Sequence, residues 1–90
     1  MTRRFLVTGR VQGVGFRWFV EKEARAIGLG GWVRNNDNGS VEVLASGSEE
    51  QLARLRSSLR DGPRAARVDE VQEFEEPETS EPSFRIEGAW

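Results

Sequence analysis

The 90-residue sequence contains neither cysteine nor histidine. Without cysteine the chain has no disulfide framework, no thiolate nucleophile and no Cys-ligated metal site. Without histidine it lacks the commonest general base, phosphoryl acceptor and transition-metal ligand. Any catalysis must therefore rest on arginine, carboxamide or carboxylate side chains, on hydroxyl groups, on Lys22 or on backbone amides.

Long apolar runs are also missing from the sequence. No segment approaches the roughly 20 apolar residues that span a bilayer, and the start is too polar for a signal peptide. We therefore expect a cytoplasmic protein that does not bind membranes. The formal net charge of −2 disfavours a nucleic-acid partner. We expect a single domain over residues 1–90, and a monomer is the default at this size.

Hydrophobic spacing and capping signals predict two helices. The apolar side chains of the first helix recur at helical spacing: Phe16, Val20, Ala24 and Ile27. Gly28 then provides the usual C-terminal signal. Ser48 and Gln51 have the spacing of a capping box, which predicts the start of a second helix that ends before Pro63.

Short apolar or alternating segments predict five strands: residues 5–10, 32–36, 40–45, 68–74 and 84–86. The Asn38-Gly39 pair predicts a hairpin with a two-residue type I′ turn. The acidic residues 75–83 contain two prolines and are expected to form an exposed loop. The β-α-β-β-α-β order with a terminal strand predicts an α+β, ferredoxin-like sandwich, with an antiparallel sheet and two helices on one face. The following aromatic residues are expected in its core: Phe16, Phe19, Trp32, Phe74 and Phe84.

The turn between the first strand and the first helix is rich in glycine. Five successive backbone amides lead into the helix N-terminus: those of Gln12, Gly13, Val14, Gly15 and Phe16. Such amides can form a concave anion site, to which Arg17 would add a planar fork of donors. Many glycine-rich turns only reverse the chain, so the spacing alone leaves both interpretations open.

The predicted topology brings a second polar side chain near this turn. In a split βαβ unit the first two strands run parallel, so their C-terminal ends share one edge of the sheet. Asn35 ends the second strand, two strand spacings or about 10 Å away. A folded-back loop and an extended arginine can close that distance, although Asn35 by itself is equally typical of an ordinary turn.

Three segments together resemble the acylphosphatase family: GRVQGVGFR at residues 9–17, GWVRN at 31–35 and NGSVE at 38–42. The resemblance implies hydrolysis of the carboxyl–phosphate bond of acyl phosphates to carboxylate and inorganic phosphate. It also implies that Arg17 binds the phosphoryl oxygens beside the loop amides, and that Asn35 holds the attacking water.

This chemistry requires few functional groups. The leaving carboxylate has a conjugate acid with a pKa of about 4, so no general acid is needed. A loose transition state asks little of a base, which leaves charge neutralisation and the placement of water. We therefore expect direct attack by water, with no metal and no cofactor.

Three other functions share this predicted fold. An RNA recognition motif would stack bases on aromatic side chains of the third strand, but residues 40–45 contain no aromatic residue. A module that handles carbamoyl phosphate, as in hydrogenase-maturation carbamoyltransferases, is a closer alternative. A regulatory small-molecule-binding domain would not need both Arg17 and Asn35.

Overall fold

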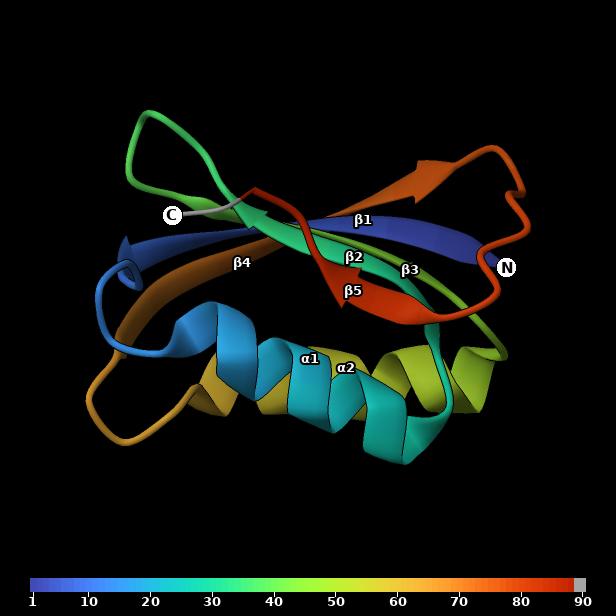
Figure 1. The fold of residues 1–90 in the computed structure, drawn as a ribbon, viewed down its shortest axis with the longest axis horizontal. Coiled ribbons are helices and arrows are strands. Elements are labelled where there is room, and N and C mark those ends of the chain that lie inside the picture. The colour runs from blue at the N-terminus through green and yellow to red at the C-terminus, as the bar shows by residue number, and fades with distance from the viewer. Residues whose placement is uncertain (89–90) are drawn as a thin grey trace.

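The structure, a computed structural model, describes residues 1–88. Its elements follow the predicted order, with these bounds: β1 Thr2–Arg10, α1 Phe16–Ile27, β2 Gly30–Asn35, β3 Val41–Ser46, α2 Glu49–Asp61, β4 Arg67–Glu76 and β5 Phe84–Ile86. The strands form one twisted sheet, and both helices lie on the same face of it (Figure 1). The predicted ferredoxin-like α+β fold is confirmed. No helix within residues 1–88 is long and apolar enough to cross a membrane.

The strand order is β4-β1-β3-β2-β5. Because β3 pairs antiparallel with both β1 and β2, these two strands run parallel and end at the same edge, as predicted. One detail differs from the expected antiparallel sheet, because β5 pairs parallel with β2. The reason is that β4 ends at the edge of the sheet where β2 begins. Glu76, the last residue of β4, pairs with Thr2 of β1, and Thr2 also pairs with Ser46 of β3. Ser46 in turn pairs with Gly30 at the start of β2. The chain thus crosses to the start of β2 and continues in the same direction.

The core lies between the sheet and the two helices. Alternate strand residues point toward the helices and are fully buried: Phe5, Val7, Val33, Val41, Val43 and Ala45. The predicted leucine stripe of α2 covers them, with Leu52, Leu55 and Leu59 at 0% exposure. Burying each leucine contributes about 2 kcal/mol, so this stripe fixes α2 on the sheet.

The two helices begin in different ways. At α2 the predicted capping box is present: the Gln51 backbone N–H donates to Ser48 Oγ (3.1 Å) and the Ser48 N–H donates to Gln51 Oε1 (2.8 Å). At α1 the N-cap is Gly15, with a left-handed φ of 78°, no side-chain cap and no acidic residue in the first turn. The positive end of the α1 dipole is therefore left without a compensating side chain.

The hairpin between β2 and β3 lies where it was predicted, but the two-residue type I′ turn is wrong. The Asn36 N–H donates to the Ser40 carbonyl (2.9 Å), and the Gly39 N–H donates to the Asn36 carbonyl (3.1 Å). Residues 37–39 thus form a three-residue loop, in which Gly39 has a positive φ of 93° and Asn38 does not. The Asn38 side chain instead accepts hydrogen bonds from the Ser40 N–H (3.0 Å) and Oγ (2.6 Å). These local bonds favour the longer loop over the type I′ turn.

The prediction of a common aromatic core is wrong for Trp32 and Phe74. Phe16 and Phe84 are buried and Phe19 packs against the core, but Phe74 is 38% exposed and Trp32 is only partly buried. Strand alternation places both on the helix-free face, where guanidinium groups cover their rings: Arg4 at 4.5 Å from Phe74 and Arg34 at 5.0 Å from Trp32. The residues Glu75 and Glu76, expected in a loop, extend β4.

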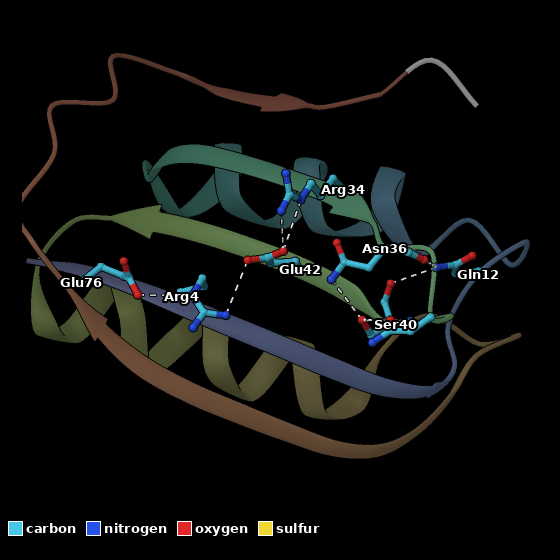
Figure 2. A network of polar contacts seen from close by, with 8 residues as sticks. Arg4, Gln12, Arg34, Asn36, Ser40, Glu42 and Glu76 are labelled. Carbon is cyan, nitrogen blue, oxygen red and sulfur yellow. Dashed lines mark hydrogen bonds and ion pairs between the residues drawn. The ribbon is translucent and has the colours of Figure 1, made fainter.

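The same helix-free face carries a network of ion pairs across the four strands β2, β3, β1 and β4 (Figure 2). Glu42 accepts hydrogen bonds from Arg34 (Nη2–Oε1 2.9 Å) and also pairs with Arg4 (3.5 Å). Arg4 in turn binds Glu76 on β4 (3.2 Å). Glu42 therefore pairs across the sheet and takes no part in the pocket described below.

Candidate active site

A pocket of about 360 Å³ opens at the N-terminal end of α1. Three segments line it, namely the β1–α1 turn, the end of β2 and the segment at and after the end of β5: Val11, Gly13, Gly15, Phe16, Arg17, Trp18, Asn35, Ile86 and Gly88. The predicted meeting of the glycine turn, Arg17 and Asn35 therefore occurs. Gln12 and Val14 do not line the pocket, and the Gln12 side chain contacts the hairpin instead.

The backbone of the turn is held open by glycine. Gly13 and Gly15 have φ values of 73° and 78°, which residues with a Cβ rarely adopt. Within residues 1–88, no amide from residue 12 to residue 18 donates a hydrogen bond to another protein group. These donors stand at the uncapped end of α1, where the helix dipole adds a partial positive charge.

Arg17 has a buried donor that lacks a partner among the described residues. The Nη1 atom is buried and makes no hydrogen bond with the described residues. A buried polar atom without a partner costs about 1–3 kcal/mol, more when it is charged, so such atoms require an explanation. Here Nη1 belongs to a pocket-lining residue beside the free amides, and an anion would satisfy all of these donors together.

Asn35 reaches the pocket from the last position of β2. It pairs with Val41 in the ladder, which fixes its backbone, and its partly buried side chain forms part of the pocket wall. A carboxamide presents both a donor and an acceptor. It can therefore bind a water molecule or a phosphoryl oxygen in this position.

The rest of the pocket wall is apolar. Trp18 is 63% exposed at the surface of α1, with the Lys22 ammonium 5.4 Å from its ring centroid. Ile86 comes from β5, which pairs with β2 through Val33. Val11, Ile86 and Gly88 were not expected in the site. Ile86 and Gly88 were missed because no local pattern in the sequence shows which strand β5 joins.

The described part of the chain offers little to a metal ion. Within residues 1–88 no three carboxylate side chains lie close enough to hold one. Arginine, backbone amides and a carboxamide instead form the polar part of the pocket. Such a donor set suits phosphate or another small oxyanion.

The structure combines a ferredoxin-like fold with a pocket whose donors suit a small anion. The sequence model of the acylphosphatase family matches residues 3–86. An acylphosphatase of Koribacter versatilis (strain Ellin345) is 63% identical over 90 aligned positions, and the match covers 99% of this chain and 82% of that protein. The crystal structure of acylphosphatase from Bacillus subtilis superimposes with a TM-score of 0.91, at 38% identity, and covers 94% of this chain and 96% of that one. The chain therefore belongs to the acylphosphatase family.

A larger protein contains a similar unit. The structure of full-length HypF in the phosphate- and nucleotide-bound form is 31% identical, with a TM-score of 0.91. The match covers 97% of this chain and 12% of that one. The same fold thus also occurs as a small part of a longer chain.

Proposed function

We propose that this chain hydrolyses acyl phosphates to a carboxylate and inorganic phosphate at the pocket beside α1. The observation that carries the proposal is the buried Nη1 of Arg17, which has no hydrogen-bond partner within residues 1–88, next to the uncapped N-terminus of that helix. Both features present donors to a small anion, and family membership identifies the class of substrate.

In the proposed mechanism, the loop amides and Arg17 bind the phosphoryl oxygens. They neutralise the charge that the equatorial oxygens carry in the transition state. Asn35 holds a water molecule in line with the bond that breaks. The carboxylate leaves without a proton because its conjugate acid has a pKa of about 4. Neither a metal ion nor a general acid is needed.

The alternative is a module that handles carbamoyl phosphate, and the similarity to a small part of the longer HypF chain bears on it because it shows this fold inside a larger protein. Identity to the family members named acylphosphatase is higher, at 63% and 38%, than the 31% identity to HypF. Hydrolysis of acyl phosphates is therefore the better-supported function.

The test is the loss of benzoyl phosphate absorbance in the presence of EDTA, with the wild-type chain and Asn35→Ala. We expect turnover by the wild-type chain, reduced about a hundredfold in the variant, as when one transition-state donor is removed. Circular dichroism verifies that both proteins are folded. No turnover above background by folded wild-type protein would contradict the proposal.

Direct attack by water at phosphorus has its own test. Hydrolysis in oxygen-18 water places the label in inorganic phosphate if water attacks phosphorus. Label in the carboxylate would show attack at the carbonyl carbon and would exclude the proposed roles of Arg17 and Asn35.

We further propose that a single chain is the active unit, because the groups assigned to the chemistry, Arg17, Asn35 and the glycine turn, meet in one pocket within a single chain. Light scattering of the eluting active fraction measures its mass. A dimer as the smallest active species would contradict this part of the proposal.

A further inference from the structure

The side chain of Gln12 connects the glycine turn to the β2–β3 hairpin, at the position next to Asn35. Gln12 begins the glycine turn, but its Nε2 donates to the carbonyl oxygens of Asn36 (2.8 Å) and Ser40 (2.9 Å) in the hairpin. Figure 2 shows this carboxamide directed at the hairpin from the turn. A carboxamide nitrogen has two protons, and both are used here.

The two acceptors belong to the pair of residues that closes the hairpin loop. The Asn36 carbonyl also accepts from the Gly39 N–H (3.1 Å), and the Ser40 carbonyl accepts from the Asn36 N–H (2.9 Å). Asn35 directly precedes this pair and is itself fixed by its pairing with Val41. Gln12 therefore holds the hairpin at the position next to Asn35.

No strand ladder makes this connection directly. β1 and β2 are separated by β3, so their backbones do not hydrogen-bond to each other. Within residues 1–88, the two bonds of Gln12 are the side-chain hydrogen bonds that tie the glycine turn to the hairpin. The distance from the loop amides to Asn35 thus depends on this side chain.

We infer that Gln12 is a positioning residue, which holds the water-binding Asn35 carboxamide in line with the anion bound by the loop amides. The inference rests on the proposed function. Because the amides and Arg17 bind the anion without the Gln12 side chain, loss of its side-chain bonds should impair the chemical step far more than phosphate binding.

Gln51 on α2 provides a matched control, because its side chain contacts the C-terminal end of α1. Its Nε2 also donates to a distant backbone carbonyl, that of Ile27 (3.1 Å), across the same sequence separation of 24 residues as the Gln12–Asn36 bond. Replacement of either glutamine by methionine keeps the side-chain length and removes the donor; at Gln51 it also removes the Oε1 acceptor of the capping box, so this control loses at least as many structural bonds. A purely structural role predicts similar effects from both replacements.

The experiment measures kcat for benzoyl phosphate, the inhibition constant of inorganic phosphate and the melting temperature. We expect Gln12→Met to lower kcat about 10- to 100-fold, as for a misplaced reacting group, with less than about a threefold change in the inhibition constant. Gln51→Met should keep kcat within about twofold. A kcat for Gln12→Met equal to that of Gln51→Met would overturn the inference. It would also be overturned if Gln12→Met raised the inhibition constant of inorganic phosphate by the same factor by which it lowered kcat.

Two additions separate the possible failures. Gln12→Asn keeps a carboxamide that is one methylene shorter, and the same comparison is made with it if Gln12→Met does not fold. Combined with Asn35→Ala, either Gln12 variant should lose less than the product of the single losses, because both act on one group. A full multiplicative loss would overturn the inference. If the wild-type chain turns over and the Gln12 variants keep its kcat, the inference alone is overturned. An inactive wild-type chain overturns both the proposed function and the inference.

Discussion

Arg56 on α2 and Glu73 on β4 form a two-point ion pair, with Nε 2.6 Å from Oε1 and Nη2 2.9 Å from Oε2. Arg3 also lies near the same carboxylate, at 3.5 Å. The hydrogen bonds from Arg56 are the main reason that the pKa of Glu73 is lowered, and its charge and that of Arg3 act in the same direction. The pair links α2 to β4, which is an edge strand of the sheet.

This pair predicts a loss of stability in acid. Glu73 has its ordinary pKa near 4.5 in the unfolded chain and a lower one in the folded chain, so the unfolded chain binds the proton first. The contribution of the pair to the free energy of unfolding is thus complete above pH 4.5 and is lost as the pH falls through the lower, folded value. We expect Glu73→Gln to cost about 1 kcal/mol at pH 7 and progressively less below pH 4.5. Urea unfolding across this range measures it.

Glu75→Gln, on the same strand but exposed, is the control for this measurement. It should leave the free energy of unfolding nearly unchanged at every pH. A constant difference between the wild-type chain and Glu73→Gln from pH 7 to pH 3 would contradict the prediction.

Arg17→Lys should reduce kcat/KM about 100- to 1000-fold, because a single ammonium cannot replace the guanidinium fork. The inhibition constant of inorganic phosphate should weaken as well, since Nη1 is placed to bind the anion. Steady-state hydrolysis of benzoyl phosphate gives both values. Arg54→Lys, at an exposed position of α2, is the control, and near-normal turnover by Arg17→Lys would remove Arg17 from its proposed role.

The glycines of the pocket and of β2 should respond differently to alanine. A Cβ on Gly15 meets no atom within 4 Å, so Gly15→Ala costs only the strain of its left-handed backbone, about 1–2 kcal/mol. A Cβ on Gly31 would collide with the Leu44 carbonyl of β3, so Gly31→Ala should not fold stably. Urea unfolding and circular dichroism distinguish the two variants. Equal free energies of unfolding for Gly15→Ala and Gly31→Ala would contradict the prediction.

Trp18→Ala should change which acyl groups are preferred. The exposed indole forms an apolar wall beside the anion donors, where an aromatic acyl group can stack. We expect the KM for benzoyl phosphate to rise about threefold to tenfold, and the KM for acetyl phosphate to change little. Trp32→Ala, on the helix-free face, tests for general effects. Equal changes for both substrates would exclude contact between Trp18 and the acyl group.

Local signals were sufficient to predict most of the fold from the sequence. The capping box at Ser48 and Gln51 and the glycine stop at Gly28 depend on neighbours in the chain, and both are present in the structure. The hairpin was placed correctly, but its loop type depends on side-chain bonds between Asn38 and Ser40 that dipeptide preferences do not describe. Trp32 was assigned to the core by its hydrophobicity, yet its position in the β2 pleat places it on the opposite face.

The candidate site was predicted only in part. The Arg17 turn and Asn35 meet because β1 and β2 run parallel, which the order of elements implies. Ile86 and Gly88 were missed because the strand partner of β5 follows from tertiary structure alone. The two bonds of Gln12 were missed for the same reason, since each joins residues more than 20 positions apart.

The parallel pairing of β5 with β2 makes enzymatic activity a probe of the final stage of folding. The pocket takes its walls from residues near 11–18, from residue 35 and from residues 86–88, so it is complete only when both ends of the described chain are in place. Contacts over such long sequence separations form slowly, because the intervening chain has to be ordered first. Full recovery of turnover after dilution from urea should therefore follow the recovery of helical signal.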